Sequence, residues 1–424
     1  ADVVQWDDLS GENQQFRLQN MGGGHVRLLN RLTNKALAPA DGATTEGARL
    51  SQYTPNNDAI QQWQLVPVAT IVDETPGSGE CGTGTPHARV TGSGGNYQVN
   101  GNNVGSSYLD AINMAIGSLP ANRTSPQRIT VDADGSIGTG RIDLPSNIIF
   151  EVCGTMNVGN SANNGSVQAF GARNVSIPFL KMTGNPYFGM RFRDVHNLHL
   201  GQIDLRLSGG LGIRFDRDAP GGGAAPTSTN VRMDHIYVSG TNNHGVETWH
   251  VDGLTIGTVI ARNTGYAGLL LNGSRNATIG LVDGEGTGTG TGYATLRFAN
   301  RNGRVGNGYP TNIIVDRVIS RGGARGLFCV SESGGAQINQ IDFANNGNNS
   351  ALIENCYNVA IDSGTIESGG EFRLAARSEF ANNRDISIRN LTVRNTSVRE
   401  SPCGENISWV NLNHSGTGSV NVCP

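Results

Sequence analysis

The chain has 424 residues, of which 60 are glycine and 16% are charged, and its formal net charge is -4. This composition does not fit a coiled coil or a helical bundle. The negative balance argues against a nucleic-acid partner, because general nucleic-acid binding depends on an excess of cations. Since no apolar run approaches the length that spans a bilayer, no membrane partner is expected. The length allows one large core or two domains.

Residues 1–67 differ from the rest and contain two similar stretches. One runs from Val3–Trp6 to Asn13–Phe16, and the other from Arg49–Tyr53 to Gln61–Trp63. Each combines a short strand, a loop and a Gln-x-aromatic ending. This pattern resembles the ricin-type β-trefoil lectins, whose repeats close on Gln-x-Trp. We therefore expect 1–67 to form part of a β-trefoil.

The resemblance to ricin-type lectins implies carbohydrate binding through an aspartate in a Cys-Leu-Asp pattern. The corresponding run here is Ala36-Leu37-Ala38, which lacks that acid. A structural role is therefore the stronger interpretation for this repeat.

A linker and a capping helix are expected before the largest part of the chain. Residues 68–80 contain Pro76-Gly77-Ser78-Gly79, which is typical of a linker. Beyond them, over about Tyr108–Leu119, apolar residues recur at the spacing of an amphipathic helix. Such a helix would cover the open core at the entrance of a solenoid. We assign residues 81–424 to one domain.

The six cysteines show no metal-ligand spacing such as Cys-x-x-Cys. An even number favours disulfides, and disulfides favour a secreted, extracellular protein. Two pairs follow from position: Cys81–Cys153 at the start of the large domain and Cys403–Cys423 near the C-terminus. For Cys329 and Cys356, which lie on neighbouring repeats, buried free thiols are the main alternative.

From about Arg128 the chain repeats a short strand, an Asn or Gly turn and a second short strand. The step from Gly189 to Gly212 and from Gly245 to Gly268 is 23 residues. A fixed period of short strands predicts a β-solenoid, because each coil buries its apolar face only against its neighbours. Eight repeats in phase predict an all-β fold, a right-handed parallel β-helix. The first strands of these repeats begin at residues 189, 212, 245, 268, 294, 326, 351 and 371.

Alternation along the repeated strand indicates which side chains face outward. If Val246 and Thr248 point inward, Glu247 and Trp249 point outward, and Asp216 falls on the neighbouring coil. Two carboxylates are the usual acid and base or nucleophile of glycoside hydrolysis. We therefore predict Asp216 and Glu247 as catalytic residues, with His244 sharing the proton transfer; the alternative is a charged outer face.

The remaining outward residues are predicted to bind substrate. Arginine suits carboxylates and sulfates, and an exposed Trp offers a platform for a sugar ring. The predicted substrate-binding residues are Arg191, Arg214, Trp249, Asn272, Arg297, Arg325 and Arg373. They favour an anionic glycan.

A uronate polymer would also permit β-elimination. Such a lyase would neutralise the uronate with arginine or Ca²⁺. Hydrolysis remains the first expectation, since no compact Asp cluster for Ca²⁺ lies on these strands. No metal or other cofactor is predicted.

The repeats from Arg128 to Ser397 resemble the pectin-lyase-like superfamily of parallel β-helix enzymes, which includes polygalacturonases, pectate lyases and carrageenases. The resemblance implies a polysaccharide-degrading enzyme that acts on a polysaccharide or oligosaccharide, and we expect a monomer. Only Asn243-His244-Gly245-Val246 is similar to a polygalacturonase motif, so no catalytic residue is carried over from that family. A non-catalytic glycan-binding solenoid is the third alternative.

Overall fold

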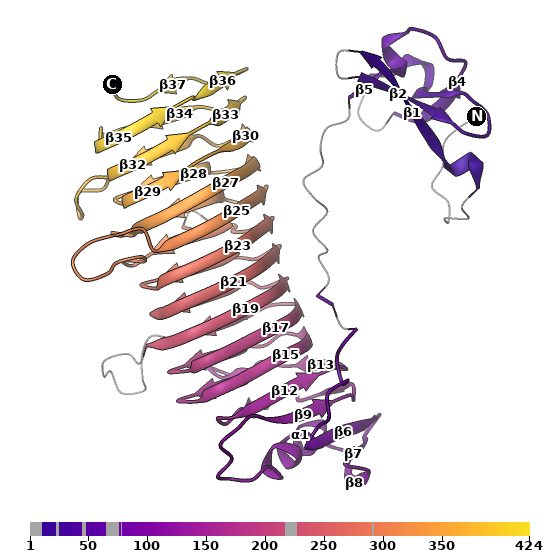
Figure 1. Ribbon diagram of the computed structural model, residues 1–424, viewed down its shortest axis with the longest axis vertical. Coiled ribbons are helices and arrows are strands. Elements are labelled where there is room, and N and C mark those ends of the chain that lie inside the picture. Colours follow the sequence, from indigo (N-terminus) through magenta and orange to yellow (C-terminus); the bar gives the residue numbers. More distant parts are fainter. Residues whose placement is uncertain are drawn as a thin grey trace. The chain divides into compact units, whose positions relative to one another are not determined.

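The computed structural model describes residues 11–22, 25–44, 48–64, 76–77, 79–216, 227–290 and 292–424. The chain divides into two compact units, Ala1–Asp73 and Glu74–Pro424 (Figure 1). The Val3–Trp6 stretch, most of the expected linker 68–80 and the glycine-rich insertion at 217–226 lie outside the described residues.

The N-terminal unit contains an antiparallel sheet, as expected for part of a trefoil. Gln61 is buried, where it donates to the Thr54 carbonyl at 3.0 Å, and Trp63 Nε1 donates to the Leu37 carbonyl at 3.0 Å. The Gln-x-Trp motif therefore fastens neighbouring segments of the unit. Its elements are η1 (Glu12–Gln14), β1 (Phe16–Gly22), β2 (His25–Asn30), β3 (Ala36–Pro39), η2 (Ala40–Gly42), β4 (Leu50–Tyr53), η3 (Ala59–Gln61) and β5 (Trp63–Gln64).

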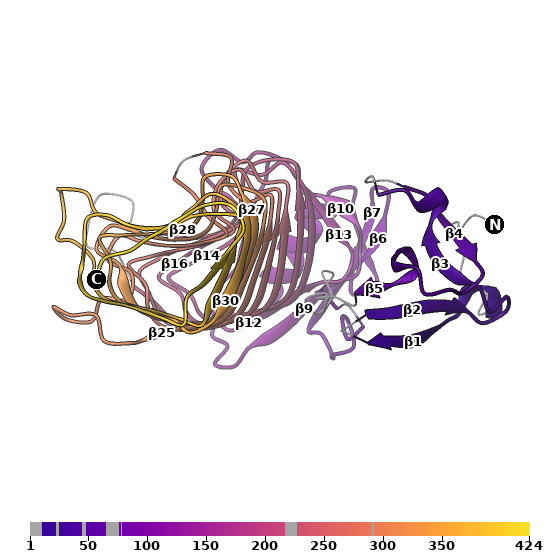
Figure 2. The ribbon, with the colours of Figure 1, turned by 90° about the horizontal axis from the view of Figure 1, so that it is seen from above.

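The second unit is a parallel β-helix, which confirms the predicted fold class. Its coils alternate between two sheets that run along the solenoid (Figures 1 and 2). In the described residues the short-strand sheet has 12 strands. They are β11 (Ile142–Asp143), β14 (Gly165–Phe170), β16 (Phe188–Arg193), β18 (Leu211–Phe215), β20 (Val246–Trp249), β22 (Leu269–Asn272), β24 (Leu296–Ala299), β26 (Arg325–Cys329), β28 (Asn349–Glu354), β31 (Phe372–Ala375), β34 (Val398–Glu400) and β37 (Val420–Asn421).

The long-strand sheet has 20 strands in the same described ranges. It comprises β6 (Ala88–Ser93), β7 (Asn96–Val99), β8 (Asn102–Gly105), β9 (Gln127–Val131), β10 (Gly135–Ser136), β12 (Ile148–Val152), β13 (Thr155–Val158), β15 (Arg173–Gly184), β17 (His196–Leu207), β19 (Ser228–Ser239), β21 (Val251–Arg262), β23 (Arg275–Glu285), β25 (Ile313–Arg321), β27 (Gly334–Asn346), β29 (Tyr357–Ile361), β30 (Gly364–Gly369), β32 (Arg384–Arg389), β33 (Leu391–Arg394), β35 (Glu405–Val410) and β36 (Asn413–Ser415).

The first coils are covered by α1 (Tyr108–Gly117), which confirms the predicted capping helix. The Ser107 hydroxyl accepts the Asp110 N–H at 3.1 Å and so caps the helix N-terminus. Tyr108, Ile112 and Ala115 are buried in the main core, where α1 packs on β6 and β7. In the described residues, no helix is long and apolar enough to cross a membrane.

Every other residue of the repeated strand enters one continuous core. Val246, Leu269 and Leu296 are in register on successive coils and are fully buried in this core. Successive side chains of a strand point to opposite faces. The residue that follows each of these three, such as Glu247 after Val246, therefore faces outward. The short-strand sheet therefore has a regular apolar inner face and a variable outer face.

An asparagine ladder lines the turn that leads into the long strands. Asn147, Asn174, Asn197 and Asn230 all have φ between 53° and 59°, the left-handed region that Asn tolerates. The side-chain amides of the last three donate to the asparagine one coil earlier, at 2.8, 3.0 and 2.7 Å. The predicted role of Asn at the coil corners is confirmed.

The three disulfides are Cys81–Cys153, Cys329–Cys356 and Cys403–Cys423. The first and third pairs were predicted. The alternative of buried free thiols for Cys329 and Cys356 is wrong. Stacking of neighbouring coils leaves their Cα atoms 6.3 Å apart, within bonding range.

Candidate functional site

The outward residues of the short-strand sheet form one column across successive coils. Strand pairing places Arg191 beside Arg214, Arg214 beside Glu247, and Glu247 beside Leu270. The next pairing places Leu270 beside Arg297. Side chains that lie far apart in sequence are therefore neighbours on this face.

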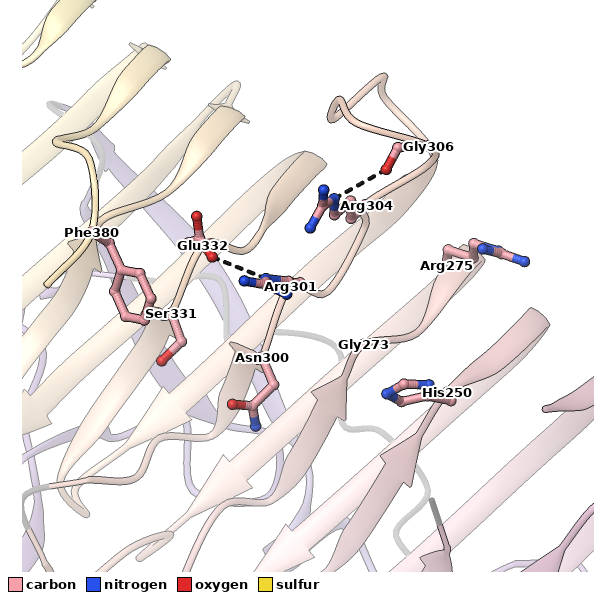
Figure 3. A pocket seen from close by; sticks show the side chains of 10 residues that line it. All are labelled: His250, Gly273, Arg275, Asn300, Arg301, Arg304, Gly306, Ser331, Glu332 and Phe380. Atoms are coloured by element: carbon pink, nitrogen blue, oxygen red, sulfur yellow. Dashed lines mark hydrogen bonds and ion pairs between the residues drawn. The ribbon is translucent and has the colours of Figure 1, made fainter. Parts of the chain in front are cut away.

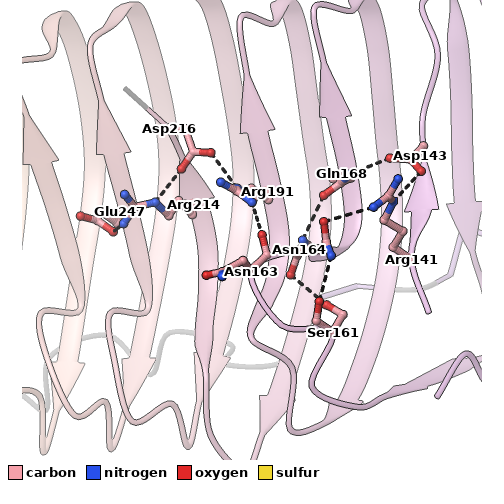
Figure 4. Close-up of polar contacts among 11 residues, drawn as sticks. Arg141, Asp143, Ser161, Asn163, Asn164, Gln168, Arg191, Arg214, Asp216 and Glu247 are labelled. Carbon is pink, nitrogen blue, oxygen red and sulfur yellow. Dashed lines mark hydrogen bonds and ion pairs between the residues drawn. The ribbon is translucent and has the colours of Figure 1, made fainter. Parts of the chain in front are cut away.

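Two predicted carboxylates share one arginine in this column (Figure 4). Arg214 donates from Nε to Asp216 at 2.7 Å and from Nη1 to Glu247 at 2.5 Å. Arg191 Nε donates to the other oxygen of Asp216 at 2.7 Å. The carboxylate side chains are only 6% and 5% exposed. The four residues form one charged network in which the carboxylates are buried and the arginine side chains are partly exposed.

Glu247 accepts two further hydrogen bonds, one from its own strand and one from the next coil. Trp249 Nε1 donates to its second oxygen at 2.7 Å, and the Asn272 amide donates to the same oxygen at 3.5 Å. Burial raises the pKa of Glu247, and the charge of Arg214 offsets this only in part. Trp249 was expected to be exposed, but it is half-buried because its indole N–H is turned onto Glu247.

His244 is buried beside the column, where it contacts two tyrosines. Its ring centroid lies 5.3 Å from that of Tyr266 and 5.5 Å from that of Tyr293. Burial, with the charges of Arg297 and Arg214, lowers the His244 pKa to about 3. Nδ1 accepts the Ala267 N–H at 3.1 Å, so the neutral ring carries its proton on Nε2. His244 is therefore equipped to donate a hydrogen bond and not to accept a proton.

Arg297 differs from the paired arginines of the network. Its guanidinium lies over the rings of Tyr293 and Phe328, 5.7 and 5.2 Å from their centroids. Its Nε is buried and has no hydrogen-bond partner in the described residues. Burial lowers the Arg297 pKa. This cation is therefore the predicted substrate-binding arginine best placed to receive an anionic group.

The last two predicted arginines lie further along the solenoid. Arg325 donates from Nε to Asn349 at 3.0 Å and lies over Phe328 at 4.7 Å. Arg373 forms an ion pair with Glu371 at 3.6 Å. It lies five strand spacings from Glu247, which is roughly 24 Å. The structure therefore separates Arg373 from the carboxylates.

Two cavities flank the charged network. The Asp216 cavity, of about 580 Å³, lies on the side where the chain enters the short strands. It is lined by amides, two aromatic rings and three network residues, Arg191, Arg214 and Asp216. Its lining includes Asn163, Asn185, Tyr187, Phe188, Arg191, Arg214, Asp216 and Asn243. The size is that of a site for a small sugar unit.

The Arg301 cavity, of about 460 Å³, lies at the turns that follow the short strands (Figure 3). Its lining includes His250, Arg275, Asn300, Arg301, Arg304, Glu332 and Phe380. Asn300 also donates to Asn272 at 2.7 Å, and Asn272 donates to Glu247. A chain of hydrogen bonds therefore connects the second cavity to the carboxylate network that borders the first.

The sequence interpretation missed the aromatic residues of this face. Tyr266 and Tyr293 stack with centroids 4.0 Å apart and ring planes 15° apart. Both stand in a repeated Gly-Tyr-Ala, at 265–267 and 292–294, immediately before a short strand. That repetition was the available signal, because equal positions in adjacent coils must stack.

Comparisons with known proteins give one family-model match and similarity to two solved structures. The N-terminal part matches the family model described as ricin-type beta-trefoil lectin domain-like, over residues 1–53 and 12–115. A comparison of the sequence with curated proteins gives no match. Among solved structures, the chain is similar to a family 28 exopolygalacturonase of Yersinia enterocolitica, with 10% identity, a TM-score of 0.47 and coverage of 94% of this chain and 83% of that one.

A second solved structure is the A-module of the mannuronan C-5 epimerase AlgE6 of Azotobacter vinelandii. Its identity is 12% and its TM-score 0.33, with coverage of 75% of this chain and 96% of that one. The architecture itself rests on the stacked coils and on the family-model match. The chain is a parallel β-helix preceded by a segment similar to ricin-type β-trefoil lectin domains.

Proposed function

We propose that the chain is an extracellular polysaccharide-degrading enzyme, a glycoside hydrolase that uses Glu247 and Asp216 and needs no cofactor. The observation that carries the proposal is the raised pKa of Glu247 beside a second carboxylate on the neighbouring coil. Glycoside hydrolysis uses such a pair, one acid with a raised pKa and a second carboxylate. Asp216 lines one cavity, and Arg214, which lines the same cavity, joins it to Glu247.

In this proposal, Glu247 protonates the oxygen of the leaving sugar. Asp216 lines its cavity and pairs with two guanidinium groups, so it supplies the carboxylate that activates water or attacks the sugar. Arg214 contacts both acids and holds them in one geometry. The Nε2–H of His244 and the cation of Arg297 would bind an oxygen and an anionic group of a uronate or sulfated glycan.

A β-eliminating lyase is the second candidate, and Arg297 favours it. Its pKa is lowered by burial and its Nε has no hydrogen-bond partner in the described residues. A guanidinium cation beside a uronate carboxylate would neutralise its charge and so make the neighbouring C–H more acidic. In this candidate, arginine neutralises the substrate carboxylate in place of Ca²⁺.

The deciding experiment offers the full chain pectic, alginate, glycosaminoglycan and carrageenan polymers. Reducing ends without new ultraviolet absorbance support hydrolysis, whereas absorbance of an unsaturated uronate supports elimination. Neither signal, together with retained polymer binding, would support a non-catalytic solenoid and overturn the proposal. Gel filtration of the same sample tests the expected monomer.

Variants locate the site. Glu247→Gln and Asp216→Asn are expected to abolish cleavage, while Glu285→Gln keeps it. Glu285 is a matched control, since its side chain is 67% exposed on the long-strand sheet. Full activity in both site variants would place the chemistry on another face.

A further inference from the structure

A second group of catalytic residue types lies on the long-strand sheet. Ser176 on β15, His199 on β17 and Asp234 on β19 occupy three successive strands. The Ser176 hydroxyl lies 3.0 Å from His199 Nδ1, and His199 Nε2 lies 2.8 Å from an Asp234 oxygen. The order hydroxyl, imidazole and carboxylate is that of a nucleophile, its base and the group that orients the base.

The hydrogen-bond partners settle which nitrogen can act as the base. A carboxylate only accepts hydrogen bonds, so the His199 proton lies on Nε2, toward Asp234. Nδ1 then holds a lone pair directed at the Ser176 hydroxyl. Burial raises the pKa of Asp234, but hydrogen bonds from His199 and Arg232 outweigh it, so the pKa is lowered and the carboxylate persists.

His199 and Asp234 line a cavity of about 380 Å³, together with Gln202, Pro178 and Phe179. Ser176 adjoins this cavity through its contact with His199. Pro178 and Phe179 offer apolar surface for an acyl chain. Gln202 accepts the Gly77 N–H at 3.1 Å, which fixes its side chain at the cavity wall. Its amide group is the candidate donor to the oxyanion that forms during acyl transfer.

We propose that Ser176, His199 and Asp234 form an esterase centre that removes short acyl groups, such as acetyl, from hydroxyls of a sugar. The centre lies on the long-strand sheet and the carboxylate network on the short-strand sheet, so the proposal does not depend on glycan cleavage.

The proposed reaction needs only the ester and water. Ser176 Oγ attacks the ester carbonyl carbon while His199 Nδ1 takes the hydroxyl proton. The carbonyl–alkoxy bond breaks, the sugar oxygen leaves with that proton, and an acyl-serine remains. Water, deprotonated by the same imidazole, then hydrolyses the acyl-serine to a carboxylic acid and restores the serine.

The test treats the full chain with a fluorophosphonate probe and locates the label by peptide mass spectrometry, alongside hydrolysis of 4-nitrophenyl acetate. We expect label on Ser176, and at least about a 100-fold loss of ester hydrolysis in both Ser176→Ala and His199→Asn. Circular dichroism of each variant shows that the solenoid is folded. Polysaccharide cleavage by Ser176→Ala is expected to stay unchanged.

A similar relay, with His196 on β17, Thr229 on β19 and Asp194 just before β17, supplies the control. The Thr229 hydroxyl lies 2.7 Å from His196 Nδ1, and His196 Nε2 lies 3.0 Å from Asp194. His196→Asn is expected to keep ester hydrolysis, because a secondary hydroxyl is the more hindered nucleophile. Absence of label at Ser176, or hydrolysis that survives Ser176→Ala but not His199→Asn, would overturn the proposal in favour of unreactive polar contacts or a lone imidazole.

Discussion

Two ladders run along the same coils and behave differently. The asparagine ladder repeats one residue type in one conformation, from Asn147 to Asn230, and links each coil to the last by a neutral hydrogen bond. The outward column of the short-strand sheet changes residue at almost every coil and buries its charges against one another. The uniform column repeats the same contact from coil to coil, whereas the residue types of the variable column are not dictated by the coil repeat.

The largest expected effect is on activity, and it distinguishes the outward column from the asparagine ladder. Glu247→Gln removes the proposed acid while keeping its shape, and kcat/KM is expected to fall about 100- to 10,000-fold. Asn197→Ala, on the other ladder, is expected to leave kcat/KM within a few-fold of the parent. Initial rates on the polymer identified by the substrate panel measure both. Equal losses in the two variants would mean that activity reports only on stability.

Removing Arg214, the cation shared by Asp216 and Glu247, tests how strongly the free energy of unfolding depends on this pairing. Arg214→Ala leaves two nearly buried carboxylates without their common partner, so the free energy of unfolding is expected to fall by about 3–5 kcal/mol. Arg275→Ala removes a more exposed partner of Asp252, with side chains 44% and 27% exposed, and should cost at most about 1 kcal/mol. Urea unfolding gives both values. Similar costs would contradict the buried network.

Acidification is expected to destabilise the site through His244. The pKa of His244 is lowered from 6.5 to about 3. Below pH 6.5 this imidazole therefore binds a proton in the unfolded chain but not in the folded chain. Stability contributed by this group is therefore present above pH 6.5 and is lost toward pH 3, with a slope of at most about 1.4 kcal/mol per pH unit. Urea unfolding between pH 7 and 4 should show a steeper loss in the parent than in His244→Asn. An equal loss of stability with falling pH in the parent and in His244→Asn would contradict this prediction.

The smallest effect belongs to the uniform ladder. Asn197→Ala removes two ladder hydrogen bonds and places alanine at φ 59°, so a loss of about 1–2 kcal/mol is expected. Asn197→Gly removes the same bonds but tolerates the backbone angle, so it should cost less. Thermal unfolding of the pair separates hydrogen bonding from backbone conformation. If Asn197→Gly lost more stability than Asn197→Ala, the backbone φ angle would not be the limiting factor.

The repeats predicted the solenoid because a coil must present the same residue types at the same corner. Eight strands of the short-strand sheet followed from Gly and Asn spacing. Strands such as β11 and β37, each two residues long, have too few residues to show alternation. Alternation also placed Asp216 and Glu247 outward, on adjacent coils.

Side-chain pairing could not be predicted in the same way. Whether Arg214 faces solvent or two acids depends on rotamers and on the covering loops, which a strand pattern does not contain. The same limit applied to Trp249, whose indole N–H turns onto Glu247. The Cys329–Cys356 bond likewise depended on how adjacent coils stack.

The parallel stacking of coils has a mechanical consequence. Hydrogen bonds between parallel strands lie across the strands, so here they point along the solenoid axis. A force along that axis acts on the interfaces between neighbouring coils. Coils should therefore detach and unfold one at a time instead of all together. The covalent bond between Cys329 and Cys356 interrupts such peeling between two neighbouring coils. A solenoid pulled along its axis would thus yield in small steps, with a firm stop near β26.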